Sequence, residues 1–245
     1  MLKNCWSLIS GASGGIGKSV AKEFAKNGSN LLLLARDEEK LTNIKEELKE
    51  FEVEVYTFAF DISSYDEVKR FFKNLPKITK KLDIVINNAA VMHTSSIATT
   101  KKEDIDKVFQ TNVFSGFYIL SFASRMMLRA KKGSIVNINS IMGCSGASGH
   151  SLYSATKASI SGFTKSLAKE LAPFVRVNEI APGVVDTKMI QKLSDEEKEK
   201  IIKNTPLNRI ANPDEIAKVA LFLSSDMASF ITAECIRVDG GLCSI

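Results

Sequence analysis

The sequence predicts an α/β domain built on a doubly wound parallel sheet with helices on both faces. Short apolar runs alternate with amphipathic helical patterns along the chain, which is typical of βαβ units. Glycine-rich or polar residues follow the ends of these runs, where the ligands of such sheets bind. No low-complexity linker or internal repeat divides the 245 residues, so we expect a single domain over 1–245.

Six apolar runs are the expected strands. They are Cys5–Ser10, Leu31–Ala35, Val53–Phe60, Ile84–Ile86, Ile135–Ile138 and Val175–Ile180. Continuous apolar runs suit parallel strands, because helices cover both faces of the sheet. Right-handed crossovers through the intervening helices then produce the doubly wound arrangement. Glu179 interrupts the last run, and a carboxylate buried there requires a partner or a neutral state.

A glycine-rich turn at Gly11–Gly17 follows the first expected strand and precedes a helical pattern that includes Val20 and Phe24. Strand, glycine turn and helix together form the context of a dinucleotide-binding fingerprint. The glycines let the backbone approach a pyrophosphate, and the helix N-terminus offers free N–H groups and a positive dipole end. The spacing here is G-x-x-x-G-x-G rather than the commoner G-x-G-x-x-G. We therefore expect a Rossmann-like sheet that binds a dinucleotide.

Tyr153 and Lys157 stand four residues apart, and Ser140 precedes the tyrosine by thirteen residues. Residues four apart share one face of a helix. A phenol has an ordinary pKa of about 10, and a neighbouring ammonium is expected to lower that pKa. Tyr153 can then exchange a proton with a carbonyl or alcohol oxygen during hydride transfer, while Ser140 hydrogen-bonds the same oxygen. The pair Tyr65–Lys69 has the same spacing but no serine partner, and we expect it on a surface helix.

These motifs resemble the classical short-chain dehydrogenase/reductase family over nearly the whole chain. The similar segments are Ser10–Gly17, Asn87–Ala90, Pro182–Thr187 and Val238–Gly241, together with Asn112, Ser140, Tyr153 and Lys157. The resemblance implies that the last four residues are catalytic. In this interpretation Asn112 orders a water that links Lys157 to solvent, and Ser140 and Tyr153 bind the substrate oxygen.

The resemblance also implies a nicotinamide cofactor. The residues expected to bind it are Gly11, Ser13, Gly14, Gly15, Ile16, Gly17, Arg36, Asp61, Ile62, Asn88, Ala89, Ala90, Tyr153, Lys157, Pro182, Gly183, Val185 and Thr187. Four positions depart from the family pattern. Ser10 replaces threonine but keeps the hydroxyl. Ala90 adds a methyl group where relatives have glycine, and Asn208 and Ala233 stand where glycine is frequent.

The end of the second expected strand indicates which nicotinamide cofactor is used. Ala35 occupies the place where NAD-preferring relatives carry an acid that binds the ribose 2′-OH. Arg36 follows it, and an arginine fork can hold a 2′-phosphate through two parallel hydrogen bonds. Asp37 is expected to cap the next helix. We therefore expect NADP(H), and Asp61 resembles the family residue that contacts adenine.

Within the family, Phe163–Ala168 and Asn178–Thr187 are most similar to the 3-oxoacyl-[acyl-carrier-protein] reductases. This implies NADP(H)-dependent reduction of a ketone to a secondary alcohol in fatty acid synthesis. A free small ketone, sugar or cyclic alcohol is the alternative substrate, and a non-catalytic nicotinamide-binding regulator is a remote alternative. Residues 187–210 carry an amphipathic pattern that is expected to form a short helix pair, either a lid over the site or ordinary surface helices.

Two further features concern partners. The helix bearing Tyr153 is rich in the small residues Ala155, Ala158, Ser159, Gly162 and Ser166. In the family such a helix often pairs across a subunit interface, which implies a homotetramer or homodimer, and close packing within one subunit is the alternative. A basic cluster, defined as Arg125, Arg129, Lys131 and Lys132, is either favourable charge at a helix C-terminus or a dock for an acidic acyl carrier.

Composition and charge argue against several other classes. The net charge is +5, but lysines alternate with acids, and a basic stripe or aromatic platform for nucleic acid is missing from the pattern. No run reaches the length of a membrane span, and the start of the chain reads as a strand rather than a signal peptide. Four cysteines without paired spacing suggest free thiols in the cytoplasm. The two histidines lack ligand spacing, so we expect no metal.

Overall fold

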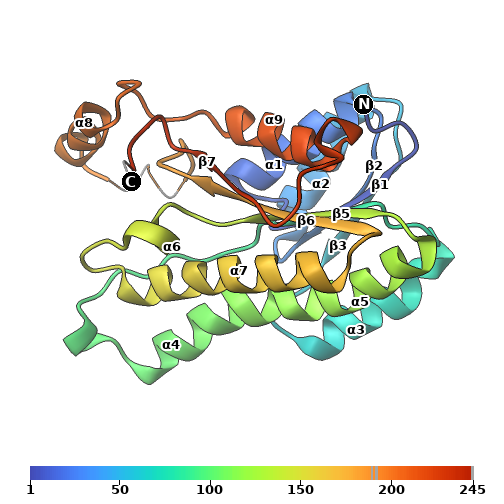
Figure 1. Ribbon diagram of the computed structural model, residues 1–245, viewed down its shortest axis with the longest axis horizontal. Coiled ribbons are helices and arrows are strands. Elements are labelled where there is room, and N and C mark those ends of the chain that lie inside the picture. The colour runs from blue at the N-terminus through green and yellow to red at the C-terminus, as the bar shows by residue number, and fades with distance from the viewer. Residues whose placement is uncertain (189, 191–192, 244–245) are drawn as a thin grey trace.

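A computed structural model describes residues 1–188, 190 and 193–243 (Figure 1). Within these residues, seven strands form one sheet in the order β3-β2-β1-β4-β5-β6-β7, and every neighbouring pair is parallel. The strands are β1 (Trp6–Ser10), β2 (Asn30–Ala35), β3 (Val55–Ala59), β4 (Ile84–Asn87), β5 (Gly133–Ile138), β6 (Val175–Pro182) and β7 (Cys235–Val238). The order changes direction between β1 and β4, so the predicted single, doubly wound α/β domain is confirmed. The sequence did not predict β7, and β3 is shorter than expected.

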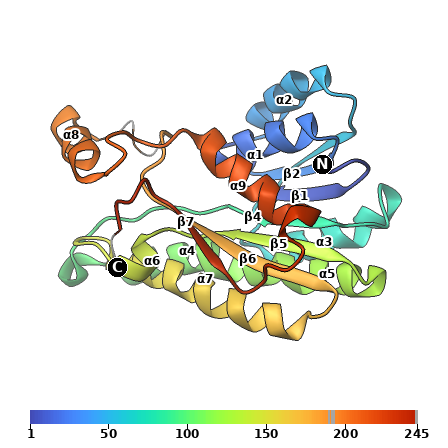
Figure 2. The ribbon, with the colours of Figure 1, turned by 45° about the horizontal axis from the view of Figure 1, so that its top comes forward.

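Helices cover both faces of the sheet, as predicted (Figure 2). One face of the sheet is covered by α1 (Gly15–Lys26), α2 (Glu38–Glu47) and α9 (Pro213–Ser224). The opposite face is covered by α3 (Tyr65–Asn74), α5 (Ser115–Ala130) and α7 (Ser151–Glu170). Two shorter elements lie near the carboxyl ends of the strands, α6 (Met142–Ser145) and α8 (Asp195–Asn204).

An apolar core lies between the sheet and each of the two helix layers. Alternate residues of β2 contribute to each core, because successive strand side chains point to opposite faces. Leu31 and Leu33 pack in the core under α1 and α9, whereas Leu32 and Leu34 pack in the core under α3, α5 and α7. All four side chains are fully buried, which explains the continuous apolar run in this segment.

Local signals set the helix starts. The Asp37 carboxylate accepts a hydrogen bond from a backbone N–H in the first turn of α2, so the predicted cap is confirmed. Ser194 and Asn212 are the N-caps of α8 and α9. Each forms reciprocal hydrogen bonds with the glutamate three residues further along the chain. This capping box satisfies two backbone donors at each helix start.

The segment predicted to be a lid contains one described helix, α8, and no residue of that helix is buried. In Figures 1 and 2, α8 projects beyond the strand ends, apart from the helices that cover the sheet. Met189 and residues 191–192 of the segment lie outside the described residues. The lid remains a prediction, because an exposed helix at this edge is compatible with closure and with an ordinary surface position.

Candidate active site

The glycine-rich turn lies between β1 and the N-terminus of α1, at the carboxyl edge of the sheet. A β-carbon on Gly17 would lie 2.3 Å from the carbonyl oxygen of Gly11, and Gly11 has a φ of 65°, so both positions require glycine. Gly14 is the N-cap of α1, and the first turn carries no acidic side chain. The first N–H groups of α1, among them those of Gly15 and Ile16, are therefore suited to an anion.

Ser10 and Asn88 join this turn to the end of β4. The Ser10 hydroxyl accepts hydrogen bonds from the backbone N–H groups of Asn88 at 3.0 Å and Ala89 at 3.1 Å. The Asn88 amide donates to the carbonyl oxygens of Ser10 at 3.0 Å and Gly11 at 3.1 Å. The hydroxyl that replaces the family's threonine thus bonds two loops together. Two of the expected cofactor-binding segments therefore form one connected surface.

The segment Pro182–Thr187 leaves β6 and passes close to the start of α1. A β-carbon on Gly15 would lie 2.4 Å from Cγ2 of Thr187. The N–H of Gly183 donates to the carbonyl of Val238 at 3.0 Å, which ties the segment to β7. The structure therefore brings the third expected cofactor-binding segment against the first.

Arg36 and Asp61 follow neighbouring strands, β2 and β3, at the same edge. Arg36 is exposed, and Asp37 beside it is occupied as a helix cap. The carboxylate of Asp61 accepts from the N–H of Ser63 at 3.0 Å and its hydroxyl at 2.7 Å, and Ile62 is buried. The acid at Asp37 is thus held in the helix cap, and Arg36 is the cation at the end of β2.

Tyr153 and Lys157 lie one turn apart on α7 and are both buried, with 6 % and 2 % of their surfaces exposed. Ser140, two residues beyond β5, lies close enough to the Tyr153 hydroxyl to act on its pKa, and the Ser140 hydroxyl accepts from the N–H of Met142 at 3.2 Å. Burial raises the pKa of Tyr153 to about 12, and Ser140 opposes this rise. The fold thus unites three members of the predicted tetrad. It gives the phenol a raised pKa where the sequence predicted a lowered one.

The position of Lys157 explains this difference. Its Nζ donates to the carbonyl oxygen of Ile138 at 2.8 Å and lies over the Tyr153 ring, 5.7 Å from the ring centroid. The ammonium is thus bonded to a carbonyl of β5, and burial is the main influence on the pKa of the Tyr153 phenol. Burial also lowers the pKa of Lys157 to about 8, while the charge of Glu179 opposes this change.

Asn112 lies in η4 (Gln110–Phe114), a π-helical turn between α4 (Lys102–Phe109) and α5. Such turns often occur at functional sites. Its Oδ1 accepts from the N–H of Val91 at 2.8 Å, and its Nδ2 donates to the carbonyl of Val91 at 2.9 Å and the Thr156 hydroxyl at 3.1 Å. The side chain therefore ties the loop after β4 to the helix that carries Tyr153. A role in ordering water remains a prediction.

Two residues of this network were not identified from sequence patterns. Thr156 bonds the amide of Asn112, and the Ser161 hydroxyl donates to Glu179 at 2.6 Å. Their signal was helical spacing: Ser161 follows Lys157 by four residues, so the two share a face of α7. The sequence left open whether the buried Glu179 has a partner or is neutral, and the structure gives it a hydrogen-bond partner in Ser161.

A cavity of about 490 Å³ touches the segment Pro182–Thr187 at Val184. Residues 205–207 and 237–241 form much of its wall, and none of the four tetrad residues lines it.

Across the described ranges, no three His, Cys, Asp or Glu side chains are arranged to hold a metal ion. Nor does this part of the chain contain a helix long and apolar enough to cross a membrane.

Comparisons with known proteins agree with this geometry. The family described as "Enoyl-(Acyl carrier protein) reductase" matches residues 11–243. The chain is 38% identical over 244 residues to the 3-oxoacyl-[acyl-carrier-protein] reductase of Chlamydia trachomatis, covering 99% of this chain and 98% of that protein. The enzyme of the same name from Aquifex aeolicus is 36% identical over 96% of both chains.

Solved structures show the same fold. A putative gluconate dehydrogenase from Agrobacterium tumefaciens superposes with a TM-score of 0.96 at 28% identity, over 100% of this chain and 98% of that one. A short-chain dehydrogenase/reductase titled glucose/ribitol dehydrogenase, from Brucella melitensis, superposes with a TM-score of 0.93 at 32% identity, over 100% and 98%.

The fold and these relatives define an oxidoreductase of the Rossmann-like class. More narrowly, the chain belongs to the short-chain dehydrogenase/reductase family. Membership implies a nicotinamide cofactor, NAD or NADP. The glycine cradle, in which a single β-carbon at Gly17 would collide with the Gly11 carbonyl, is compatible with a dinucleotide pyrophosphate.

Proposed function

We propose that the protein is an NADP(H)-dependent reductase that converts a ketone to a secondary alcohol by hydride transfer. The observation that carries this proposal is the buried Tyr153, with Ser140 beside its hydroxyl and the Lys157 ammonium over its ring. A phenol keeps its proton at neutral pH whether its pKa is the ordinary 10 or about 12, so Tyr153 holds a proton that it can donate. A ketone oxygen needs a proton as its carbon receives a hydride, and we therefore propose reduction as the direction.

Each site residue has a role in this proposal. When bound, the nicotinamide cofactor supplies the hydride. Ser140 and Tyr153 hydrogen-bond the carbonyl oxygen, and Tyr153 donates the proton to it. Lys157 offers its remaining ammonium donors to the cofactor ribose, and Asn112 orders a water that links Lys157 to solvent. The glycine turn, the loop 88–90 and the segment 182–187 hold the cofactor, and residues 187–210 close over it as a lid.

Arg36 supports the choice of NADP(H). It is the exposed cation at the end of β2, and its neighbour Asp37 is engaged with the first turn of α2. Ala35, the position where relatives that prefer NAD carry an acid, has neither charge nor hydrogen-bonding group. A 2′-phosphate at the strand end would thus meet an arginine, beside an Asp37 carboxylate that is already engaged with the first turn of α2.

We propose a 3-oxoacyl thioester, carried by an acyl carrier protein in fatty acid synthesis, as the substrate. The names of the relatives from Chlamydia trachomatis and Aquifex aeolicus support this choice. The four free cysteines of the chain suit a cytoplasmic enzyme, because that compartment keeps thiols reduced. The second candidate is a free sugar or small ketone, which the titles of the two solved relatives favour.

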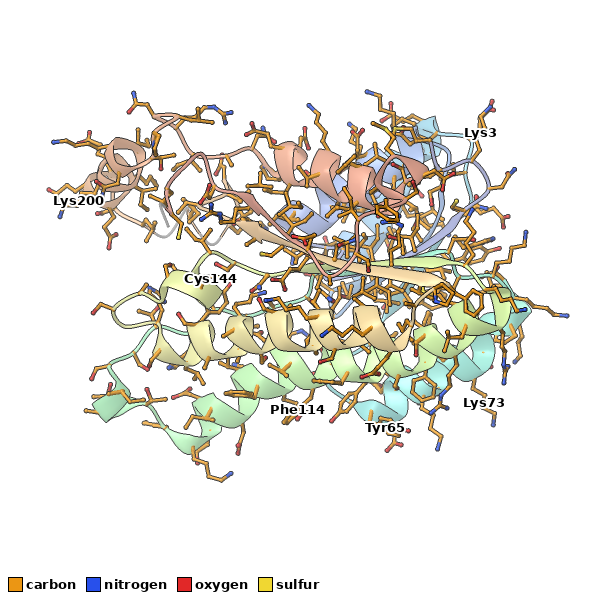
Figure 3. The ribbon with its side chains drawn as sticks, in the orientation of Figure 1. Lys3, Tyr65, Lys73, Phe114, Cys144 and Lys200 are labelled. Atoms are coloured by element: carbon orange, nitrogen blue, oxygen red, sulfur yellow. The ribbon has the colours of Figure 1, made fainter. Side chains whose placement is uncertain are left out.

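We also propose that α7 pairs with a second copy of the chain in a homodimer or homotetramer. Ala155, Ala158 and Gly162 on this helix are exposed, and a β-carbon on Gly162 would meet no atom within 4 Å. Phe114 is 44% exposed on the outer side of the same helical layer (Figure 3). Small exposed residues permit the close approach of a second helix. Packing within one subunit would instead have buried these residues.

An NADPH-oxidation screen tests the proposal. Acetoacetyl thioesters, free and carrier-bound, are compared with aldoses, ketoses and cyclic ketones, each with NADPH and NADH. Oxidation with the thioesters supports the leading substrate, and oxidation with sugars or cyclic ketones alone supports the second candidate. If no ketone is reduced while NADPH still binds, the protein is a nicotinamide-binding regulator instead.

A further inference from the structure

A row of polar side chains, buried except for the half-buried Cys235, crosses the sheet beneath α7. The register places Asn87 of β4, Asn137 of β5, Glu179 of β6 and Cys235 of β7 side by side. Asn87 donates to Asn137 at 3.1 Å, and Asn137 donates to the hydroxyl of Thr164 on α7 at 2.9 Å. Neutral groups can meet their needs in this way. Glu179 differs because a carboxylate brings a charge into the layer.

Glu179 is only partly satisfied by hydrogen bonds. It is 1 % exposed, and its Oε1 accepts from the Ser161 hydroxyl at 2.6 Å. Ser161 in turn accepts from the Asn139 amide at 2.9 Å. The second carboxylate oxygen, Oε2, has no hydrogen-bond partner, and neither does Oδ1 of Asn139. A buried carboxylate in this state stays ionised only with a positive charge close by.

Lys157 is a buried positive charge on this face of α7. Tyr153, Lys157 and Ser161 follow one another at four-residue steps, so all three side chains lie on the face that meets the sheet. Lys157 is 2 % exposed and bonds the carbonyl of Ile138 on β5, next to the strand that carries Glu179. The negative charge of Glu179 favours the protonated form of Lys157 against the effect of burial.

We propose that Glu179 is a positioning residue of the hydride-transfer site, because its buried carboxylate is the counter-charge that keeps Lys157 an ammonium beside Tyr153. The catalytic meaning rests on the proposed function, whereas the charge coupling belongs to the folded chain alone. Cys235 of β7 is a further titratable neighbour of Glu179, and Lys165 of α7 and Cys144 of α6 lie around Cys235. Lys165 and Cys144 are exposed, so solvent screens their influence.

The coupling is tested by titrating Lys157 directly. The protein is prepared with ¹³C-labelled lysine, and the Lys157 signal is assigned by its loss in Lys157→Met. Glu179→Gln keeps the shape and the bond from Ser161 but removes the charge. The Lys157 midpoint should then fall by roughly one pH unit, the low end of the shift expected from an opposite charge. Glu170→Gln, at the exposed end of the same helix, should leave the midpoint in place.

An unchanged or raised midpoint in Glu179→Gln overturns the inference. Ser161→Ala is the second variant, and it decides the matter if Glu179→Gln does not fold. It removes the hydroxyl that stabilises the carboxylate, so the Lys157 midpoint should fall by a smaller amount. A midpoint unchanged in Ser161→Ala, with the fold retained, then overturns the proposal.

The pH profile connects the coupling to catalysis. Removing a negative charge lowers the pKa of every nearby acid, so the alkaline limb of kcat/KM for ketone reduction should move to lower pH in Glu179→Gln. A purely structural role would instead lower kcat/KM at every pH and leave the limb in place, which overturns the positioning role. If the unaltered protein reduces no ketone, the proposed function fails while the Lys157 titration still decides the inference.

Discussion

The ammonium of Lys157 donates to the carbonyl oxygen of Ile138, the last residue of β5, at 2.8 Å. A buried charge on the helix is thereby bonded to the sheet beneath it. Desolvation makes this arrangement costly, and it lowers the pKa of Lys157 from 10.5 to about 8. The cost depends on pH, because it disappears when the amine loses its proton.

We expect the free energy of unfolding to rise between pH 8 and 9 because of Lys157. In this window the unfolded chain holds the lysine proton and the folded chain releases it, so stability increases with pH. The contribution is about 1 kcal/mol per pH unit. Urea denaturation at pH 7, 8 and 9 measures it, and Lys157→Met should abolish the rise. Burial raises the pKa of Cys235 to about 12. Above pH 9 the unfolded chain therefore loses this thiol proton while the folded chain keeps it, which lowers the free energy of unfolding. An equal rise in Lys157→Met would contradict this account.

Tyr153→Phe should reduce turnover by a factor of roughly 10²–10⁴, the loss expected when a general acid is removed. NADPH binding should be largely retained, since the ring and its packing remain. Steady-state kinetics and cofactor fluorescence measure the two effects. Tyr65→Phe is the matched control: Tyr65 begins the surface helix α3, is 46% exposed and contacts the rings of Tyr118 and Phe122. Near-normal turnover in Tyr153→Phe would exclude it as the proton donor.

Arg36→Ala should weaken NADPH binding by about 1.5–3 kcal/mol, the contribution of a hydrogen bond to a charged group. NADH binding should hardly change, because NADH lacks the 2′-phosphate. Dissociation constants from fluorescence titration test this. Ala35→Asp should shift the preference toward NADH by adding a ribose acceptor that repels the phosphate. Equal losses for both cofactors in Arg36→Ala would show that the arginine does not contact the 2′-phosphate.

Gly15→Ala should weaken NADPH binding and lower the free energy of unfolding by about 1–3 kcal/mol, the usual cost of overpacking. The new methyl group would lie 2.4 Å from Cγ2 of Thr187, so the segment after β6 has to move away from α1. Thr187→Ser removes that Cγ2 atom, and the double variant should recover part of both losses. Cofactor titration and thermal melting provide the measurements. A double variant no better than Gly15→Ala would place the damage elsewhere.

Charge reversal at Arg129 and Lys132 should raise the KM for a carrier-bound substrate, most steeply at low salt, where electrostatic steering is strongest. A small thioester should be unaffected. Both residues are exposed and lie just before β5, whereas Ser140 follows its other end, about 20 Å away for a six-residue strand. Steady-state kinetics at two salt concentrations separate the cases. An equal response of the two substrates would reduce the basic cluster to helix-end charge.

Much of the fold could be read from local patterns. The apolar run at Leu31–Leu34 predicted a strand buried on both faces, and all four side chains are fully buried. The glycine turn predicted a sharp backbone at Gly11, which has a positive φ. Cys235–Val238 escaped prediction because none of its residues is fully buried. The strand is completed by its pairing with β6, which local hydrophobicity does not record.

The sequence by itself determined which chemical groups are available and their order along the chain: a glycine turn at 11–17, Arg36 without an acid at Ala35, and Tyr153 four residues before Lys157. Only the tertiary structure decided their electrostatic state. Ser140 meets Tyr153 because β5 ends beside α7, and burial raises the phenol pKa to about 12 where spacing predicted a fall. Glu179 faces Ser161 because β6 lies under the same helix. Residue spacing follows from helix geometry, whereas a pKa depends on desolvation and on charges brought together by distant segments.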